Sequence, residues 1–399
     1  MHWLPLFLFA LTYLGLALGR IPPFKLDRTG FAILGAVAFL ASGWISVEAA
    51  KAAVDAPTLA VLFGMMLLSA QYRLSGLYGV IGHRLARVAD PRRLLLGTIV
   101  VTALLSAVLT NDVICFALTP LLLEALLAAK RPPLPYLLAI ACASNIGSAL
   151  TPIGNPQNIL IAQSFHLPFL PFLLACGVPV VLSLAVLYWL AARWLEPGAA
   201  EPLPPAPPDA IDCWQAGKAV LLTAAVIALF LSPVPPALTA LGLAGVVLTS
   251  RRMRTREVLD LVDWQLLALF VGLFIVVRGF ELSGWTDAAR NALATRGADL
   301  THPTVLVPGV ALLGNLVGNV PAVMLMLPFV GRQPAVGYAL ALASTFAGNA
   351  VLVGSIANLI VAEQAERLGV RITFRDHLRL GLPVTLVSLT FAVAAMALW

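Results

Sequence analysis

The feature that most restricts what this chain can fold into is a series of apolar stretches, each about twenty residues long, that recurs along most of its length. Residues 3–19 and 384–398 form two of these stretches. About twenty helical residues cross a hydrocarbon layer about 30 Å thick. Only 11% of the residues are charged, against about 25% in soluble domains. We therefore predict an all-α, multi-pass membrane protein that lies in the lipid bilayer of the cell's inner or plasma membrane.

The basic residues do not indicate nucleic-acid binding, although the pI is about 9.4. They lie in short loops between the apolar stretches, where basic residues orient a membrane protein. The cysteines Cys115, Cys142, Cys176 and Cys213 form no CxxC pair. Neither a zinc site nor a disulfide framework is therefore predicted, and no cofactor other than a coupling ion is expected.

Motifs of intramembrane enzymes and of ATP-driven pumps are missing from the sequence. It contains no HExxH, no GxSxG and no GxxxxGK[ST] motif, which mark zinc proteases, serine hydrolases and P-loop ATPases respectively. The sequence therefore predicts neither an enzyme nor an ATP-driven pump.

The second half of the chain repeats the first. A proline-rich polar linker at residues 196–216 separates the two halves, because proline lacks the amide hydrogen that a helix in lipid needs. A shift of 208 positions aligns Asp55 with Asp263, Gly64 with Gly272, Ser75-Gly76 with Ser283-Gly284, Asn111 with Asn319, and Pro120 with Pro328. Further along, a shift of 200 aligns Ala143, Ser144, Gly154 and Asn158 with Ala343, Ser344, Gly354 and Asn358.

We predict two inverted-topology repeats, each with five spans, a re-entrant helical hairpin and an interrupted helix. An odd number of crossings turns the second copy upside down relative to the first. The predicted ranges are 1–195 for the first repeat (hairpin 94–130, broken helix 136–164) and 217–399 for the second (hairpin 303–331, broken helix 336–366).

The charges of the loops predict an orientation. With both termini outside and the linker cytoplasmic, only Lys51, Arg290, Arg296 and Arg332 fall outside. Apart from two arginines near span ends, the other basic residues, Arg28 among them, fall inside. This positive-inside distribution requires both hairpins to re-enter the membrane instead of crossing it.

The broken helix of the first repeat contains the densest polar motif, ASNIGSALTPIGNPQN from residue 143. Its two glycines and two prolines interrupt the helix. Opened peptide groups in lipid cost several kcal/mol each unless protein, water or a ligand bonds to them. A helix end favours an anion at its amino side and a cation at its carboxyl side. The candidate binding residues at the two breaks are Asn145, Gly154, Asn155, Asn158, Asn349, Gly354, Ser355 and Asn358. The structural alternative is a kink packed against its neighbours.

The two hairpin turns supply the other candidates, Thr110, Asn111 and Asp112 in the first and Gly318 and Asn319 in the second. An ionisable residue deep in a membrane protein is a functional hypothesis by default, so Asp112 is a candidate to carry a proton or to bind a cation. A sodium ion is expected near Asn111, Asp112 and Gly154, if sodium is the coupling ion. Alternatively, Asn111 caps the returning helix and Asp112 is an ion-paired or water-exposed acid.

With these motifs, the chain resembles the ion transporter superfamily of arsenite permeases, divalent anion–sodium symporters and sodium–proton antiporters. The resemblance lies in TNDVICFALTP, NIGSALTPIGNPQN, NLVGNVPAVMLMLP and GSIAN, and it is closest to the arsenite-permease-like branch. It implies a homodimer with a scaffold and a moving transport domain, in which the hairpin turns and broken helices flank the substrate and the coupling ion.

One departure from the family pattern bears on the coupling ion. The dicarboxylate branch has Ser-Asn-Thr at each hairpin turn, whereas this chain has Thr110-Asn111-Asp112 and Gly318-Asn319-Val320. The difference favours a proton or a single cation over two sodium ions. The function we predict is secondary active transport of a small anion or oxyanion by alternating access, coupled to a proton or sodium gradient. A cation–proton antiporter is the nearest alternative, and an anion channel is another.

Overall fold

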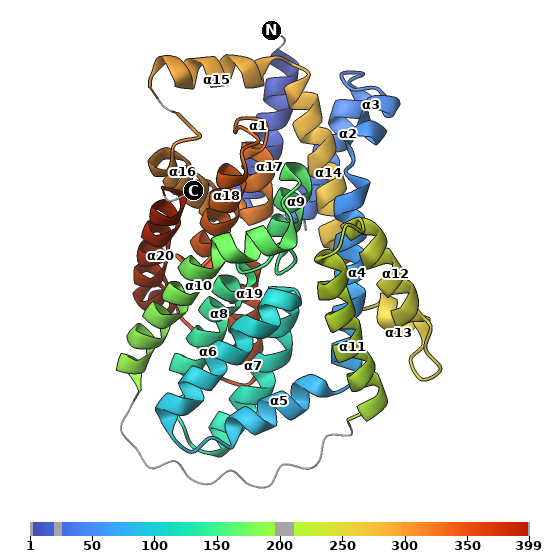
Figure 1. Ribbon diagram of the computed structural model, residues 1–399. Helices are drawn as coiled ribbons and strands as arrows, with labels where there is room; N and C mark the ends of the chain where they lie inside the picture. Colours follow the sequence, from blue (N-terminus) through green and yellow to red (C-terminus); the bar gives the residue numbers. More distant parts are fainter. Residues whose placement is uncertain (1–2, 20–25, 196–210, 298, 398–399) are drawn as a thin grey trace.

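The protein is all-helical over the residues that its computed structural model describes, which are 3–19, 26–195, 211–297 and 299–397. Helix α1 begins and α20 ends in the upper half of Figure 1, and α10 ends and α11 begins in its lower half. The helices of the first half are α1 (Trp3–Leu18), α2 (Arg28–Ala41), α3 (Val47–Ala53), α4 (Ala56–Leu74), α5 (Leu77–Ala86), α6 (Pro91–Val108), α7 (Asn111–Ala128), α8 (Leu134–Ser148), α9 (Pro156–Phe165), α10 (Phe169–Ala191) and the 3₁₀ helix η1 (Ala192–Trp194).

The second half has its α-helices in the same order and mostly of similar length. They are α11 (Cys213–Phe230), α12 (Pro236–Leu248), α13 (Thr255–Leu259), α14 (Trp264–Glu281), α15 (Trp285–Thr295), α16 (Pro303–Val317), α17 (Asn319–Met326), α18 (Pro334–Ala347), the 3₁₀ helix η2 (Leu352–Gly354), α19 (Ile356–Arg367) and α20 (Phe374–Met396). However, α17 has 8 residues where α7 has 18, and the 3₁₀ helix lies between α18 and α19. The shared order agrees with the predicted repeat. The inverted relation of the two copies remains a prediction.

Residues that match between the halves have the same local roles. Asp55 caps α4 by accepting from the Thr58 amide at 3.2 Å, and Asp263 caps α14 by accepting from the Leu266 amide at 2.9 Å. Such a cap satisfies one of the free amides at the start of a helix. The constant shift of 208 therefore reflects shared backbone requirements.

The matched glycines Gly64 and Gly272 bring pairs of helices into close contact. A Cβ on Gly64 would lie 2.5 Å from the carbonyl oxygen of Ala240 in α12, and one on Gly272 would lie 2.8 Å from that of Ala32 in α2. Small residues allow membrane helices to pack backbone against backbone. Helix α4 thus packs on α12, and α14 packs on α2.

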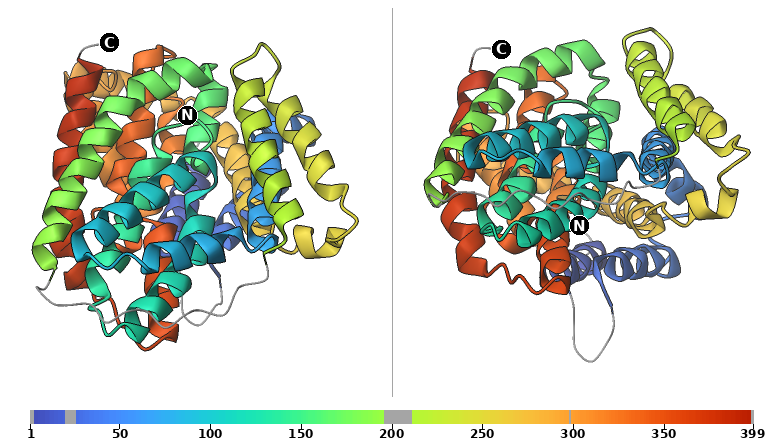
Figure 2. Two further views of the ribbon diagram at one scale, coloured as in Figure 1. Left: turned by 60° about the horizontal axis from the view of Figure 1, so that its bottom comes forward. Right: turned by 90° about the horizontal axis from the view of Figure 1, so that it is seen from below.

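The helices form two groups, which we call the frame and the bundle. The frame consists of α1 to α4 and α11 to α14. The bundle consists of α6 to α10 and α16 to α20, in which α6 packs on α8, α7 on α19, α16 on α18 and α10 on α20. In both views of Figure 2, α11 and α12 lie to one side of the bundle.

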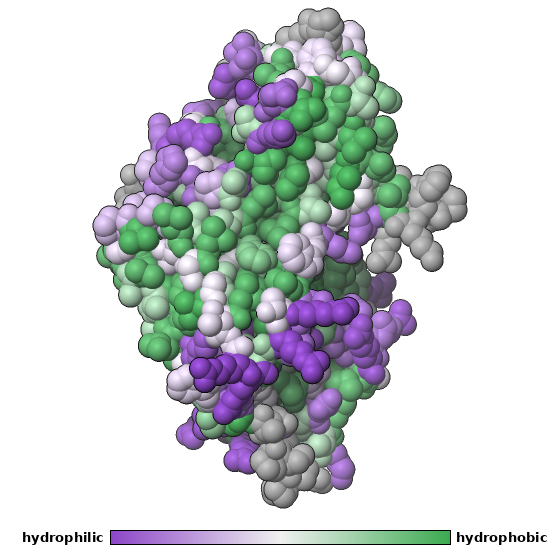
Figure 3. Space-filling model, turned by 90° about the vertical axis from the view of Figure 1, so that its right-hand side faces the viewer, coloured by the Kyte–Doolittle hydropathy of each residue, from purple (hydrophilic) through white to green (hydrophobic). Residues whose placement is uncertain are grey.

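Six helices of the described residues, α6, α7, α10 with η1, α11, α14 and α20, are long and apolar enough to cross a membrane. A seventh is the pair α3 and α4, bent by 52°, if it counts as one span. Six further helices, α1, α2, α8, α12, α16 and α18, are apolar but shorter, and α8 and α18 end at the two breaks. Figure 3 shows a broad apolar surface between polar regions on the side at the right of Figure 1, as expected of a surface in lipid.

The helices of the predicted hairpins and broken helices are as follows, while their re-entry into the membrane stays a prediction. The first hairpin is α6 and α7 and the second is α16 and α17, and the breaks separate α8 from α9 and α18 from α19. One boundary is corrected, because α11 begins at Cys213 and residues 213–216 are therefore helical instead of part of the linker. Asp212 starts this helix by accepting from the Trp214 and Gln215 amides. Residues 196–210 of the linker lie outside the described residues.

Candidate functional site

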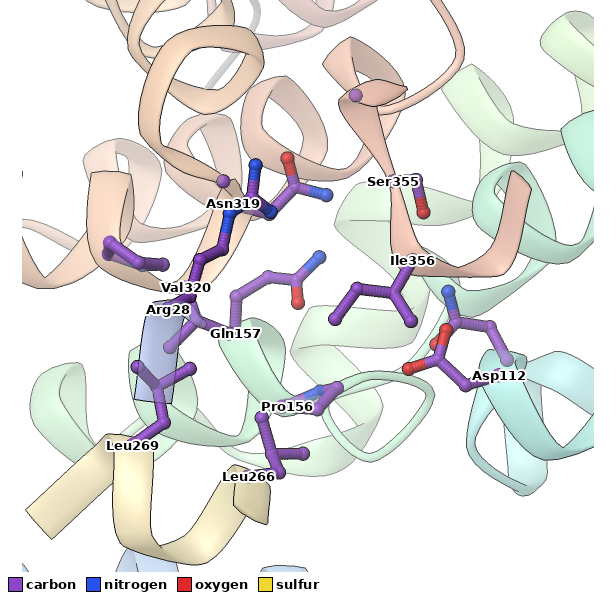
Figure 4. A pocket seen from close by; sticks show the side chains of 14 residues that line it. Arg28, Asp112, Pro156, Gln157, Leu266, Leu269, Asn319, Val320, Ser355 and Ile356 are labelled. Carbon is purple, nitrogen blue, oxygen red and sulfur yellow. The ribbon is translucent and has the colours of Figure 1, made fainter. Parts of the chain in front are cut away.

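The turns of both hairpins and the starts of both second half-helices meet at one pocket, shown in Figure 4. Its cavity has a volume of about 60 Å³. The residues that line it are Arg28, Asn111, Asp112, Pro156, Gln157, Leu266, Leu269, Gly318, Asn319, Val320, Pro321, Gly354, Ser355 and Ile356.

Asn111 is the first residue of α7 and is held by the break of the same repeat. Its side-chain amide donates to Oδ1 of Asn145 at 3.1 Å, and its backbone amide donates to the carbonyl of Gly154 at 3.3 Å. Its own Oδ1 is buried and accepts no hydrogen bond from the described residues. A buried carbonyl without a donor is costly, so this oxygen is available to a bound cation or proton donor. Thr110 occupies the N-cap position of α7, but its side chain makes no capping hydrogen bond. Asn111 is the first helical residue, so its side chain does not cap the helix either.

Asp112 is the second residue of α7 and lines the pocket. Among the described residues it forms no ion pair, which excludes an ion-paired structural acid within that part of the chain. Its carboxylate lies on the opposite side of the pocket from Arg28, with the Gln157 side chain between them (Figure 4). The pocket therefore contains one acid and one base that are not neutralised by contact with each other.

The second hairpin turn is built on Gly318, whose φ of 96° favours glycine. Asn319 follows as the first residue of α17, and its Oδ1 is also buried without a donor among the described residues. A Cβ on Gly318 would lie 3.1 Å from a guanidinium nitrogen of Arg28. The missing side chain thus makes room for an arginine from the frame.

Asn158 and Asn358 bond the carbonyls that the two breaks set free. The Asn158 amide donates to the carbonyls of Ser148 and Thr151, both at 3.1 Å. The Asn358 amide donates to the carbonyls at the matching positions, Gly348 at 2.7 Å and Val351 at 3.3 Å. Both asparagines are fully buried. Their side-chain amides replace the helical hydrogen bonds that are lost at the breaks. The protein itself thus satisfies the backbone of a helix that is opened in lipid.

The residues just before these half-helices are their caps. Oδ1 of Asn155 accepts from the backbone amide of Asn158 at 2.9 Å, and Oγ of Ser355 accepts from the backbone amide of Ala357 at 3.2 Å. Gly154 is confined by packing, since a Cβ there would lie 2.3 Å from the carbonyl oxygen of Ser148. The starts of α9 and α19 are thus set in place before any ligand binds.

Asn145 joins the two halves. Its amide donates to Oδ1 of Asn349 at 2.9 Å and to Oδ1 of Asn358 at 3.1 Å. Its Oδ1 accepts from Asn111 and from Oγ of Ser355, the latter at 3.0 Å. A satisfied buried network of this kind rigidifies the groups it connects. It links the first hairpin turn to the break of the other half.

The predicted site residues therefore fall into three groups. Those that line the pocket are Asn111, Asp112, Gly318, Asn319, Gly354 and Ser355. Those that lie behind the lining and bond or pack against other protein atoms are Asn145, Gly154, Asn155, Asn158, Asn349 and Asn358. Thr110 caps α7. A ligand-binding role for any of them stays a prediction.

Two polar lining residues, Arg28 and Gln157, are not among the candidates that the sequence predicts. Arg28 counts as a loop charge in the orientation argument, yet it lines the pocket. A signal was present in the sequence, because Arg28 begins an apolar helix directly after its capping residue, Asp27. Gln157 belongs to the break motif, and its position after Pro156 places it in the first turn of α9.

The described residues contain no group of three His, Cys, Asp or Glu side chains that would hold a transition metal or calcium. A coupling ion at this pocket would have to use one carboxylate and neutral oxygens. The unpartnered Oδ1 of Asn111 beside Asp112 fits a proton or a sodium ion, and Gly154, which offers its carbonyl to the Asn111 amide, is adjacent.

Comparison with known proteins gives three main findings. A family model described as CitMHS, citrate transporter, matches residues 13–338. The silicon efflux transporter LSI3 of Oryza sativa subsp. japonica is 32% identical over 92% of this chain and 92% of its own, and a relative named arsB from Dictyostelium discoideum is 24% identical over 94% and 88%. The crystal structure of the YdaH transporter of Alcanivorax borkumensis has a similar fold, with a TM-score of 0.63 and 18% identity over 100% of this chain and 96% of that one.

Proposed function

Because the chain belongs to the CitMHS citrate transporter family, we propose that it is a secondary active transporter of a small oxyanion, driven by a proton or sodium gradient. The family and the relatives are transporters, which confirms the predicted superfamily and the prediction that the chain is not an enzyme. The protein is a multi-pass membrane protein. The finer points of substrate, coupling and mechanism are our proposal.

The observation that carries the proposal is the single pocket where both hairpin turns and both breaks meet. A cavity built from two inverted copies can open to either side of the membrane by a movement of one group of helices against the other. Such alternating access is how we propose that the substrate crosses.

A small oxyanion is proposed over citrate because of the name of a relative. The relative LSI3 is named as a silicon efflux transporter, and silicate is therefore the first substrate to test.

The coupling ion is proposed to bind at the first hairpin turn. Asp112 supplies a carboxylate and Asn111 supplies a free carbonyl oxygen. The cation–proton antiporter remains the second candidate, but the arginine in the same pocket opposes a purely cationic substrate. The fixed pair of opposite charges fits an anion that moves together with a cation.

Uptake into proteoliposomes tests the proposal. Purified protein is reconstituted, and silicate, arsenite, phosphate, sulfate and carboxylates are offered under an imposed proton or sodium gradient. We expect saturable accumulation and counterflow of at least one small oxyanion. Flux that never saturates and shows no counterflow would indicate a channel, and accumulation of cations alone would indicate the antiporter.

Orientation and assembly are also proposals. We place both termini outside and the linker in the cytoplasm, and we expect a homodimer from the family resemblance. Cysteine labelling in intact cells tests the orientation, with Pro205→Cys expected to be protected and Arg296→Cys expected to react. Cross-linking in native membranes tests the dimer.

A further inference from the structure

We propose that Arg28 is the residue that recognises the negative charge of the substrate. The inference rests on the proposed function and deepens it, because it assigns opposite charges of substrate and coupling ion to opposite sides of the pocket.

Arg28 reaches the pocket from outside the bundle. It is the first residue of α2, a frame helix that packs on α14 and α1. The neighbouring acid Asp27 is engaged in capping this helix, where it accepts from the Gly30 amide at 2.8 Å. Within the described part of the chain, Arg28 belongs to no ion pair and makes no side-chain hydrogen bond.

An arginine without a counter-charge is unusual in this setting. Its guanidinium remains protonated at any physiological pH, and a charge inside a membrane protein normally pairs with another group. The acid in the same pocket, Asp112, lies across the cavity beyond Gln157 (Figure 4). The guanidinium therefore faces a cavity that an anion would complete.

The second hairpin turn is shaped around this guanidinium. Gly318 corresponds to Thr110 of the first turn, and a Cβ at position 318 would come within 3.1 Å of the Arg28 nitrogen. Figure 4 shows Arg28 extending beside Asn319, with the amide of Gln157 in the same cavity. A planar guanidinium and two amides offer the donors that an oxyanion requires.

The arrangement sorts the two ligands by charge. The anion would lie between Arg28, Asn319 and Gln157, and the coupling cation would lie by Asp112 and Asn111. Each ligand then meets a fixed charge of opposite sign. Arg28 neutralises the anion, and Asp112 neutralises the cation. This division predicts that changes at Arg28 alter anion affinity and leave the dependence on the cation unchanged.

The test compares Arg28→Gln, Arg28→Lys and a matched control in reconstituted full-length protein. The control is Arg92→Gln, which removes an exposed arginine from the start of another apolar helix, α6. The probes are phosphate and sulfate, which are anions at neutral pH, used with the cation gradient that drives the wild type. The readouts are the apparent affinity for the anion and the cation concentration that gives half-maximal uptake.

Arg28→Gln is expected to weaken anion affinity about 10- to 100-fold, the effect of losing a hydrogen bond to a charged group. Arg28→Lys should lose several-fold, because lysine keeps the charge but lacks the planar fork. The half-maximal cation concentration should stay unchanged in both variants, and Arg92→Gln should behave as the wild type.

Unchanged anion affinity in Arg28→Gln, or an equal loss in Arg92→Gln, would overturn the role of Arg28. If Arg28→Gln does not fold, Arg28→Lys decides: a several-fold loss supports the proposal and full affinity refutes it. A wild type that transports no anion would instead refute the proposed function, which keeps the two failures apart.

Discussion

The two hairpin turns occupy matching positions in the two halves, yet they bring opposite charges to the pocket. The first contains its own carboxylate, Asp112. The second has Val320 at the matching position and accommodates the guanidinium of Arg28 from the frame. Both asparagines, Asn111 and Asn319, keep a buried carbonyl oxygen without a donor among the described residues. The halves thus share the position of the turn and its asparagine, and they differ in the backbone of the residue before it and in the charge that faces the pocket there.

Unlike the two turns, the two breaks resemble each other, because the same residue type makes the same kind of hydrogen bond in both. Asn158 and Asn358 each bond two freed carbonyls at matching positions. The cost of an unbonded peptide group in lipid is the same in both halves, so both halves keep the asparagine. The contrast indicates that the repeat preserves what the backbone needs and varies what the ligands meet.

The largest expected effect is that of Asp112→Asn on coupling. If Asp112 carries a proton, the variant should lose gradient-driven accumulation altogether and its pH dependence, while still exchanging substrate downhill. If it binds sodium, sodium activation should weaken and the pH dependence should stay. Uptake and counterflow in proteoliposomes measure both.

Val320→Ala is the matched control for that experiment, because it alters the same position of the second turn without removing a charge. It should retain accumulation. Normal accumulation and normal ion dependence in Asp112→Asn would remove the charge asymmetry of the turns from the mechanism.

The next effect is that of Asn158→Ala and Asn358→Ala on stability. Asn158→Ala removes the bonds to two carbonyls, whereas after Asn358→Ala the Val351 carbonyl still accepts from the Gly354 amide at 2.9 Å. At about 1–3 kcal/mol per unbonded group, a loss of about 2–6 kcal/mol is expected for Asn158→Ala and of about 1–3 kcal/mol for Asn358→Ala. Thermal unfolding in detergent, followed by size exclusion, should show a loss for both variants. Gln157→Ala serves as the control, since its amide makes only a long 3.5 Å contact with Thr345. A loss in only one variant would break the equivalence of the breaks.

The smallest effect is expected at the turn asparagines. Asn111→Ala and Asn319→Ala should each weaken binding about ten- to a hundred-fold, because each removes a hydrogen bond or ligand to a charged species. We expect Asn111→Ala to weaken cation dependence and Asn319→Ala to weaken anion affinity. The same ligand affected in both variants would contradict the division of the pocket by charge.

Much of the fold could be predicted from the sequence. An all-helical membrane protein is predicted from the apolar stretches, and interruptions are predicted at prolines and glycines, because these features act on the chain locally. The break between α8 and α9 lies within the motif that predicted it. By contrast, the boundary at Cys213 was missed, because capping by Asp212 extends α11 beyond the apolar pattern.

The candidate site was predicted only in part. Residues 110–112 and 318–319 were chosen because polar groups at a turn between apolar arms are conspicuous. The sequence could not separate asparagines that line the cavity from those that bond carbonyls behind it, since the residue type and the surrounding pattern are the same.

A multi-pass membrane protein with polar interruptions in its apolar stretches follows from the sequence alone, because burial in lipid and local backbone chemistry need only neighbouring residues. Transport is what the resemblance of its motifs to a known superfamily implies. The tertiary structure decided which groups face the pocket. Arg28 lies against Gly318, and Asn145 bonds Asn349 and Asn358, contacts between segments far apart in the chain. Such contacts depend on how whole helices pack, and no local pattern specifies them.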